Sequence, residues 1–390
     1  MKLLVFAHIP PPHHGQSYMV KLMLDHFSAE GSEIQCYHVN SRYSEDLEDI
    51  GSFRLGKAWL VLRYCIEAIW CRFRHGVRAF YYVPAPGKRA ALYRDWIVML
   101  LCRPFFPRFI HHWHAVGLGD WLRREGTWFE RWVTHRLLER PAVGIALAVP
   151  SMRDALWFRT ERVEVVANGI PDPCPDFDAV VLPRRRARLA ARRAWLDGRT
   201  DADPDSRTIR VLFLAHCTRE KGVFDALDGV LLANEQLSAS GSQLRMHLTV
   251  AGAFFTDDEE REFRERIAGA GASVHYAGFV SGDEKSRLLR ESDAFCFPTY
   301  YLAEGQPVSL IEAMACGLSI VTTRWRGIPE LLPPEHQGFV AARAPGEAAA
   351  ALLRVCMLDD AAMLRAHFLA SYTEARHVEC LRAALMPAAA

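Results

Sequence analysis

Two glutamates in the C-terminal half have a spacing that limits the chemistry they can share. An apolar run ends at Pro298, Glu304 lies in the following loop, and Glu312 lies in a predicted helix with Pro307 in its first turn. Eight residues of helix span about 12 Å, which is too far for the acid and base of a glycosidase. Carboxylates accept hydrogen bonds from hydroxyls, so the pair suits different parts of one long, polyhydroxylated ligand. The alternative is a solvent-facing glutamate and an unrelated helix-face glutamate.

Two strand–loop–helix segments of the same half predict binding of a phosphorylated ligand. The helix that follows Glu304 would place free backbone N–H groups and a positive dipole end at the carboxyl edge of a parallel sheet. In residues 213–222, a second strand is followed by Lys221-Gly222 at the start of another helix. An ammonium group at a helix N-terminus strengthens anion binding there.

The N-terminal half offers weaker signals. Gly15 lies between the first predicted strand and the first predicted helix, where a missing side chain lets the backbone approach a ligand. Residues 111–114 read His-His-Trp-His, and on a strand His112 and His114 share one face while His111 points away. No H-E-x-x-H pattern accompanies them, so no metal site is predicted.

Short apolar strands alternate with helices along both halves of the chain. Single helices between successive strands require parallel pairing, so the sequence predicts two doubly wound α/β domains with a cleft between them. Strands are predicted at 3–8, 79–83, 108–114, 145–149, 163–166, 209–215, 246–251, 273–277, 294–297, 318–322 and 338–341. Helices are predicted at 17–27, 89–102, 184–195, 223–236, 258–268, 283–291, 307–315 and 347–357.

Turn residues and composition set the predicted domain boundaries. Residues 1–170 form the N-terminal domain, which closes at an Asn-Gly-Ile-Pro turn. Residues 171–207 are punctuated by Pro, Asp and Gly and are predicted as a linker with a basic, solvent-facing helix. Residues 208–372 form the C-terminal domain, and residues 373–390 are expected to form a helix that packs back on the N-terminal domain.

The C-terminal motifs resemble those of the family 4 retaining glycosyltransferases. Residues 304–317 read Glu-Gly-x-Pro-x-Ser-Leu-x-Glu-Ala-Met-Ala-x-Gly and contain the family's Glu-x7-Glu signature. Residues 276–280, 292–295, 327–331 and 168–170 also fit the family pattern. The resemblance covers essentially the whole C-terminal half and, more thinly, the N-terminal half. It implies the GT-B fold, in which two Rossmann-like, doubly wound α/β domains face each other across a cleft.

The resemblance implies roles for individual positions. Glu312 would bind the ribose hydroxyls of a nucleotide-diphosphate-sugar donor, and Glu304 would contact the donor sugar. Gly15 would belong to a loop that faces the cleft, and His114 would contact the sugar or the acceptor. The backbone of Val308 and Ser309 would approach the diphosphate. The nucleobase would lie along Phe279 and Val280.

One departure from the family pattern concerns the diphosphate. Family members place both an arginine and a lysine there; Lys221 matches the lysine, whereas His216 stands where the arginine is expected. A neutral imidazole offers one donor rather than a bidentate cation. Either Arg219 or another residue compensates, or stabilisation of the leaving group rests mainly on Lys221. The alternative for His216 is a strand-end residue without a catalytic part.

The function implied by the resemblance is sugar transfer with retention of configuration, from a nucleotide-diphosphate-sugar to a glycan or lipid-linked acceptor. The leaving phosphate would help to deprotonate the acceptor, so neither a protein general base nor a metal or other cofactor is expected. The expected pathway is bacterial-type exopolysaccharide or lipopolysaccharide assembly. The His216 departure keeps open a nucleotide-sugar epimerase, a hydrolase or a non-catalytic nucleotide-sugar-binding protein of the same fold.

The composition is that of an ordinary globular protein. Of 390 residues, 50% are hydrophobic and 24% are charged, which excludes a collagen, a coiled coil, a small disulfide toxin and a largely disordered chain. Ten cysteines without a C-x-x-C pair favour the reducing cytosol. The N-terminus is interpreted as a buried strand rather than a signal peptide. The most apolar stretch, residues 59–70, carries Arg63 and Glu67, so no transmembrane helix is predicted.

The charge is unevenly distributed. Residues 51–140 hold sixteen Lys and Arg against six Asp and Glu, a net charge of +10, whereas the whole chain carries +1. This stretch is rich in aromatic residues, so it either docks on an anionic surface or forms a basic domain whose aromatics are core. No nucleic-acid-binding signature is present, and no nucleic-acid partner is predicted. We expect peripheral attachment to the cytoplasmic face of the cell membrane through Trp59, Trp70, Phe105 and Phe106.

Overall fold

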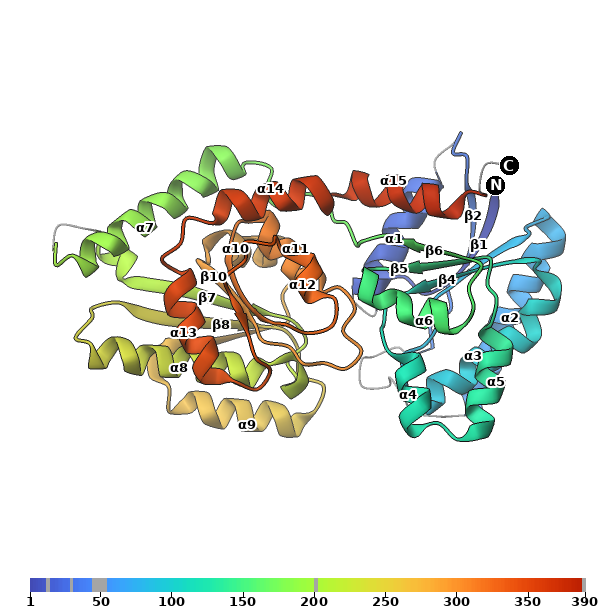
Figure 1. Ribbon diagram of the computed structural model, residues 1–390, viewed down its shortest axis with the longest axis horizontal. Helices are drawn as coiled ribbons and strands as arrows, with labels where there is room; N and C mark the ends of the chain where they lie inside the picture. Colours follow the sequence, from blue (N-terminus) through green and yellow to red (C-terminus); the bar gives the residue numbers. More distant parts are fainter. Residues whose placement is uncertain (12–14, 29–30, 44–54, 200–202, 388–390) are drawn as a thin grey trace. The chain divides into compact units, whose positions relative to one another are not determined.

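The computed structural model describes residues 1–11, 15–28, 31–43, 55–199 and 203–387. The chain forms two compact units (Figure 1). The N-terminal unit comprises residues 1–169, 302–306 and 375–390, and the C-terminal unit comprises residues 170–301 and 307–374. These boundaries differ from the predicted ones: residues 171–207 belong to the C-terminal unit, and a five-residue loop after Tyr301 belongs to the N-terminal unit.

The N-terminal unit is built on a six-stranded sheet in the order β2-β1-β3-β4-β5-β6, and every pair is parallel. Its strands are β1 Lys2–Phe6, β2 Gln35–Val39, β3 Ala79–Tyr82, β4 Arg108–Trp113, β5 Val143–Ala146 and β6 Arg162–Val165. Its helices are α1 Gly15–Phe27, α2 Leu55–His75, α3 Arg89–Cys102, α4 Leu118–Glu125, α5 Trp128–Leu138, α6 Met152–Trp157 and, from residue 375, α15 Glu374–Leu385.

Alternation along β1 supplies both halves of the hydrophobic core of this unit. Leu4 and Phe6 pack on the face covered by α2 and α3, whereas Leu3 and Val5 pack on the face covered by α1 and α15. This is the period of two that a pleated strand imposes. The sheet is therefore buried on both sides, as helix layers on a parallel sheet require.

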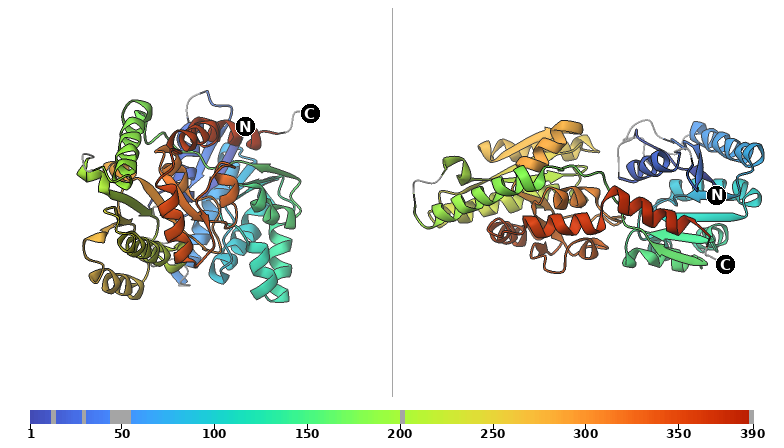
Figure 2. Two further views of the ribbon diagram at one scale, coloured as in Figure 1. Left: turned by 60° about the vertical axis from the view of Figure 1, so that its left-hand side comes forward. Right: turned by 90° about the horizontal axis from the view of Figure 1, so that it is seen from above.

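The C-terminal unit repeats the design with the order β12-β11-β10-β7-β8-β9, again all parallel. Its strands are β7 Thr208–Leu214, β8 Arg245–Ala251, β9 Val274–Gly278, β10 Ala294–Phe297, β11 Ser319–Thr323 and β12 Phe339–Val340. Its helices are α7 Leu182–Leu196, α8 Val223–Ala239, α9 Asp257–Ala268, α10 Gly282–Glu291, α11 Val308–Ala315, α12 Ile328–Leu331, α13 Pro345–Val355 and α14 Ala361–Ser371. Helices cover both faces of each sheet (Figure 2).

The two doubly wound parallel sheets confirm the predicted fold class. The sequence missed β2, because Gln35–Val39 contains polar Gln35 and His38 and lies at the edge of the sheet, where burial is partial. An edge strand with polar residues lacks the continuous apolar pattern of a central parallel strand. Sequence-based boundaries of the central strands lie within two residues of those in the structure, except that β5 ends three residues before its predicted end.

The arginine run at residues 184–188 is not the fully solvated face that the sequence predicts. Helix α7 buries Arg185, whose guanidinium donates to the backbone carbonyls of Cys316 and Leu289 at 3.1 and 3.2 Å. Arg188 and Arg192 both form ion pairs with Asp293. Residues spaced by three or four positions share one helix face, so these three arginines point inward and tie α7 to the rest of the C-terminal unit.

The C-terminal helix α15 packs on the N-terminal unit. Leu381 and Leu385 are buried in the same core as Leu3 and Val5. Arg108 of β4 donates to the carbonyl of Leu385 at 2.8 Å, which satisfies one of the last carbonyls of the helix. The end of the chain therefore completes the unit in which the chain begins.

Candidate functional site

The strand order of the C-terminal unit places its candidate site between β7 and β10. From β7 the chain continues to β8 and β9 on one side, and β10 to β12 lie on the other side. Ligands of open α/β sheets bind at such a switch point, beyond the carboxyl ends of the strands. The loops that leave β7 and β10 carry Lys221 and residues 298–307, the two segments that the sequence predicts to bind phosphate.

Lys221 is held by a short turn after β7. Residues 219–221 form a 3₁₀ turn in which the Thr218 hydroxyl accepts a hydrogen bond from the Lys221 backbone N–H at 3.2 Å. The Lys221 ammonium lies 4.8 Å from the centre of the Tyr301 ring and 5.7 Å from that of Phe297. The side chain thus lies over two aromatic rings of the β10 segment, where cation–π attraction favours its charge.

The β7 and β10 loops are joined through their backbones. The Tyr300 N–H donates to the carbonyl of Glu220 at 2.8 Å. Gly222 has a φ of +84°, and a Cβ at this position would lie 2.5 Å from the Pro298 carbonyl oxygen. Only glycine allows both this conformation and this approach. The glycine after Lys221 therefore holds the lysine against the β10 loop.

Glu312 lies in α11 and forms an ion pair that the sequence analysis missed. The Lys285 ammonium of α10 lies 2.6 Å from Glu312 Oε1, and the two side chains are 34% and 12% exposed. The pair orients the carboxylate and compensates its charge in a largely buried position. A signal for Lys285 existed: helical spacing places it on the same face as the buried Leu288 and Leu289, where a charge needs a partner.

The structure places the remaining donor-side residues at the same edge of the sheet. Val308 and Ser309 are the first two residues of α11, where backbone N–H groups have no acceptor within the helix. Phe279 follows β9 and is 55% exposed, and Val280 next to it is half-buried. Gly278 before them has a φ of +68°, which turns the chain as the strand ends.

His216 follows β7, and its ring lies 4.6 Å from the ring of Phe255. Arg219, the suggested compensating cation, forms an ion pair with Glu262 of α9. Its guanidinium also lies 4.4 Å from the centre of the Phe224 ring. Arg219 is thus held against α8 and α9.

The loop that carries Glu304 lies against His114 in the N-terminal unit. A Cβ on Gly305 would lie 2.2 Å from the backbone oxygen of His114, so the loop approaches the end of β4 as closely as glycine permits. Asn168 donates its backbone N–H to Gln306 Oε1 at 2.6 Å and its side-chain amide to the Gln306 carbonyl at 3.1 Å. Glu304 itself is buried. Sequence reasoning assigned no role to Gln306, whose partner is remote in the chain.

The histidines at residues 111–114 take the predicted sides of β4. The rings of His112 and His114 lie 4.0 Å apart, and Tyr81 bonds to His112 Nδ1 at 2.5 Å. His111 points to the other face among aromatic rings, and burial lowers its pKa to about 3. His111 is therefore a neutral core residue. The structure, over the part of the chain it describes, contains no group of three His, Cys, Asp or Glu side chains that could hold a metal ion.

Gly15 begins α1 at the carboxyl end of β1. In the strand order of the N-terminal unit, β1 lies between β2 and β3, so the chain reverses direction across the sheet at this point. The β1–α1 connection is therefore the switch-point loop of this unit, the usual position for a ligand-facing backbone. Residues 12–14, which include His13 and His14, lie outside the described residues.

The sequence of the C-terminal unit is similar to sequences of known proteins. Residues 208–357 match the family model described as glycosyl transferases group 1. Erwinia amylovora AmsK, an amylovoran biosynthesis glycosyltransferase, is 31% identical over 151 residues, which are 37% of this chain and 35% of that protein. An N,N'-diacetylbacillosaminyl-diphospho-undecaprenol alpha-1,3-N-acetylgalactosaminyltransferase of Campylobacter jejuni is 39% identical over 69 residues, 18% of this chain and 17% of that protein. The matches span about a third or less of these relatives.

The whole chain resembles solved structures in its fold. Anabaena HepE, in a complex with UDP and glucose, superposes with a TM-score of 0.66 at 15% sequence identity and covers 99% of both chains. At this identity the likeness shows the fold alone. The chain has the two-domain α/β architecture of GT-B proteins.

Proposed function

We propose that this protein is a retaining glycosyltransferase of polysaccharide assembly. It would move a sugar from a nucleotide-diphosphate-sugar to a glycan or lipid-linked acceptor. The observation that carries the proposal is Lys221, held over Tyr301 at the switch point of the domain that matches the group 1 model. The names of the relatives support the pathway, since one acts in amylovoran biosynthesis and one on a lipid-linked diphosphate.

The C-terminal unit would bind the donor. Lys221 and the start of α11 at Val308 and Ser309 would stabilise the negative charge that grows on the diphosphate as the glycosidic bond breaks. Glu312, oriented by Lys285, would accept hydrogen bonds from the ribose hydroxyls. Phe279 and Val280 would lie along the nucleobase. The diphosphate chemistry would then rest on a lysine and a helix terminus, without a metal or other cofactor.

The N-terminal unit would supply the contacts to the sugar and the acceptor. His114 and the Glu304 loop are held together at the end of β4, and Gly15 lies at the switch point of this unit. The leaving phosphate would take the acceptor proton on the face from which it departs, so configuration is retained and no protein base is required. The protein would contribute orientation and charge stabilisation.

The proposed location is the cytoplasmic face of the cell membrane, by peripheral attachment. No helix in the described part of the chain is both long enough and apolar enough to cross a bilayer. The net charge of +10 in residues 51–140 would attract the N-terminal unit to anionic lipid. A lipid-linked acceptor would be met at that surface.

A second candidate function rests on His216. Its ring lies beside Phe255. His216 occupies the position five residues before Lys221, where the family pattern has an arginine. A site with less positive charge would stabilise a leaving diphosphate less well. A nucleotide-sugar epimerase, a hydrolase or a nucleotide-sugar-binding protein of this fold would tolerate that loss.

A two-step assay tests the proposal. Thermal-shift measurements with UDP-, GDP- and ADP-sugars first identify the donor, because a ligand that binds the folded state raises its stability. The protein is then incubated with that donor, with and without a membrane extract that contains lipid-linked glycans. Nucleoside diphosphate released together with a glycosylated lipid supports transfer. Release without acceptor would identify a hydrolase, a converted donor sugar an epimerase, and a thermal shift without turnover a binding protein.

We expect His216→Arg to leave transfer intact or to raise it. An arginine there would restore the cation of the family pattern and add a bidentate contact to the diphosphate. The measurement is kcat and KM for the donor, with Phe255→Leu as the control because it removes the ring beside His216 without adding charge. A large fall in kcat for a folded His216→Arg variant would place the imidazole away from the phosphates.

A further inference from the structure

Helix α2 is apolar on two opposite faces. One face packs into the core of the N-terminal unit through Val61, Tyr64, Cys65 and Ala68. The other face carries five large apolar side chains that are 44% to 68% exposed, namely Trp59, Leu62, Ile66, Trp70 and Phe73. These five recur every three or four residues, so they form one continuous stripe along the helix. We call them the α2 stripe.

The α2 stripe is not explained by the fold. A helix that only covers a sheet needs one apolar face, and here that face is already supplied by the residues around Cys65. Single exposed apolar residues are normal on soluble proteins, but a contiguous row marks an interaction surface. The row extends beyond the helix, because the ring of Phe105 lies edge-on to Phe73 with 5.9 Å between their centres.

Phe106, which the sequence analysis proposed as a membrane contact, is excluded from this surface. It is 3% exposed and packs against the rings of Phe80 and Phe109. Its neighbour Phe105 is 38% exposed. A side chain buried among aromatic rings of the core cannot enter a bilayer without unfolding the segment between α3 and β4.

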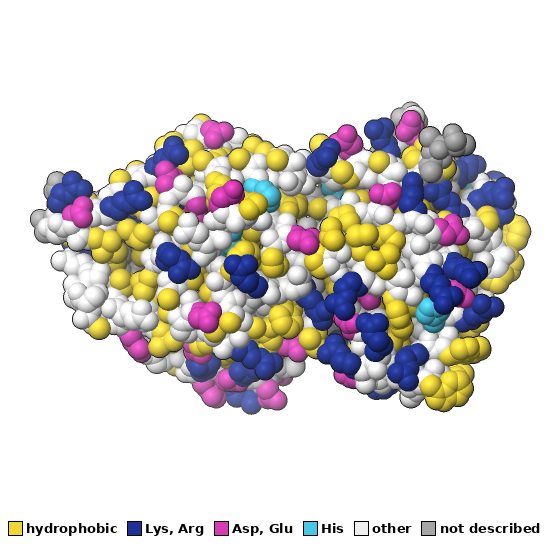
Figure 3. All heavy atoms as spheres, viewed as in Figure 1, with side chains coloured by type: hydrophobic (Ala, Val, Ile, Leu, Met, Phe, Trp, Pro, Cys, Tyr) yellow, Lys and Arg dark blue, Asp and Glu magenta, His cyan; other side chains and the backbone are white. Residues whose placement is uncertain are grey.

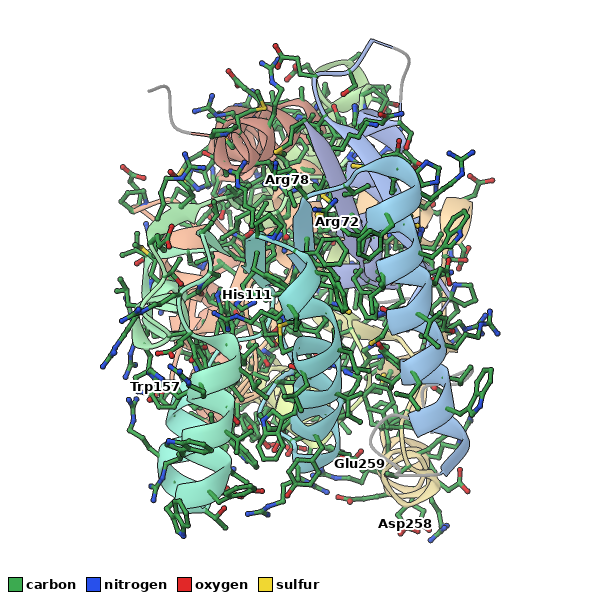
Figure 4. The ribbon with its side chains drawn as sticks, turned by 90° about the vertical axis from the view of Figure 1, so that its right-hand side faces the viewer. Arg72, Arg78, His111, Trp157, Asp258 and Glu259 are labelled. Atoms are coloured by element: carbon green, nitrogen blue, oxygen red, sulfur yellow. The ribbon has the colours of Figure 1, made fainter. Side chains whose placement is uncertain are left out.

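Helix α5 adds a second apolar cluster on the same side of the unit. Trp128, Phe129 and Trp132 are at least half exposed. Helix α3 contacts both α2 and α5, so the three helices lie side by side on one face of the unit (Figure 4). The exposed Leu100 of α3 lies between the two clusters in this row.

The charges near these clusters are predominantly positive. Exposed arginines on α2, on α5 and in the last turn of the neighbouring α4 are Arg63, Arg74, Arg123, Arg124, Arg131 and Arg136. Of the acids nearby, Glu130 is buried and pairs with Arg89, Glu139 pairs with Arg136, and Asp120 pairs with Arg123. Glu67 and Glu125 are exposed. Figure 3 shows Lys and Arg side chains gathered over α4 to α6, with hydrophobic side chains beside them.

We propose that the outward faces of α2 and α5 form a docking surface for an anionic phospholipid bilayer. The α2 stripe would lie in the plane of the membrane and enter the headgroup region, with Trp128 and Trp132 as a second anchor. Tryptophan favours that region, and the neighbouring arginines would bind lipid phosphates. This docking surface rests on the peripheral location in the proposed function, and it assigns the membrane contact to specific side chains.

Vesicle sedimentation of the full chain tests the docking surface. The vesicles are pure phosphatidylcholine or an equal mixture of phosphatidylcholine and phosphatidylglycerol, at low and at high salt. The stripe variant combines Trp59→Ser, Trp70→Ser and Phe73→Ser. A matched control combines Leu196→Ser and Leu369→Ser, which remove similarly exposed apolar side chains from the C-terminal unit. A charge variant combines Arg63→Gln, Arg74→Gln and Arg131→Gln.

We expect wild type and control to sediment with the anionic vesicles at low salt and to dissociate as salt screens the charges. The stripe variant should bind at least about tenfold more weakly, because it loses the side chains that enter the bilayer. The charge variant should lose most of the preference for anionic lipid. Circular dichroism and the thermal midpoint establish that each variant is folded.

Equal sedimentation of wild type and stripe variant would overturn the proposal, as would failure of wild type to bind anionic vesicles. Gel filtration tests whether a second copy of the chain occupies the surface instead. If wild type is a dimer, the stripe variant is a monomer and neither binds vesicles, the surface is an interface between copies. Donor binding in solution is measured in parallel. A stripe variant with normal donor binding separates a failure of docking from a failure of the proposed transferase function.

Discussion

We expect Lys221→Ala to lower kcat on the order of 10²–10³-fold and to change the dissociation constant of the donor far less. In the proposed reaction the negative charge on the diphosphate grows as the glycosidic bond breaks, so the ammonium group would stabilise the transition state more than the bound donor. The expected size is that found for loss of one preorganised donor to a developing anion. Single-turnover kinetics with saturating donor measure the effect on chemistry separately from binding.

The structure indicates that this variant will fold. The Lys221 side chain lies over the Tyr301 and Phe297 rings, and such contacts contribute about 0.5–1 kcal/mol at accessible sites. Lys21→Ala is the matched control, since Lys21 lies on the surface of α1 and pairs with Asp25. Lys221→Arg should retain part of the activity because it keeps the charge. Normal turnover of Lys221→Ala would show that the lysine does not face the diphosphate.

We expect Glu312→Ala to weaken donor binding about ten- to 150-fold while the fold survives. A hydrogen bond to a charged group contributes about 1.5–3 kcal/mol, and each 1.4 kcal/mol is a factor of ten in the dissociation constant. The effect should appear with the nucleoside diphosphate alone, because the proposed partner is the ribose rather than the sugar. Isothermal titration with the nucleoside diphosphate measures it.

The Lys285 ion pair supplies the control for this variant. Lys285→Met leaves the Glu312 carboxylate in place but removes the ammonium that lies 2.6 Å from it. We expect a smaller loss of affinity than in Glu312→Ala, with recovery in Lys285→Arg, because Lys285 positions the carboxylate rather than binding the donor. An unchanged dissociation constant in a folded Glu312→Ala variant would remove Glu312 from the ribose site.

Local patterns in the sequence were sufficient for the strands of both sheets other than the edge strand β2. Strands such as β7 and β10 are short, apolar and bounded by turns, and the helices between them have apolar residues at helical spacing. The alternation of strands and helices alone therefore predicts parallel pairing. The segment 298–317 likewise shows its loop, its helix start and its two glutamates in sequence. These features depend on residues close together in the chain, and for this reason they are readable without the fold.

The partners of the site residues depend on contacts that spacing does not encode. The loop that carries Glu304 lies against His114 in the N-terminal unit, although Glu312 eight residues later belongs to the other unit. Lys285 reaches Glu312 from a different helix, and Gln306 meets Asn168 from a remote loop. Only the order in which strands pair brings such residues to one edge of a sheet.

Burial of neighbouring residues was also decided by the tertiary structure. Phe105 and Phe106 are adjacent and chemically identical, yet one is exposed and the other lies in the core. The α2 sequence is apolar on both faces, and only the position of the sheet determines which face is covered. A period in the sequence defines the faces of a helix, but the neighbours that pack against it determine which face remains for a partner.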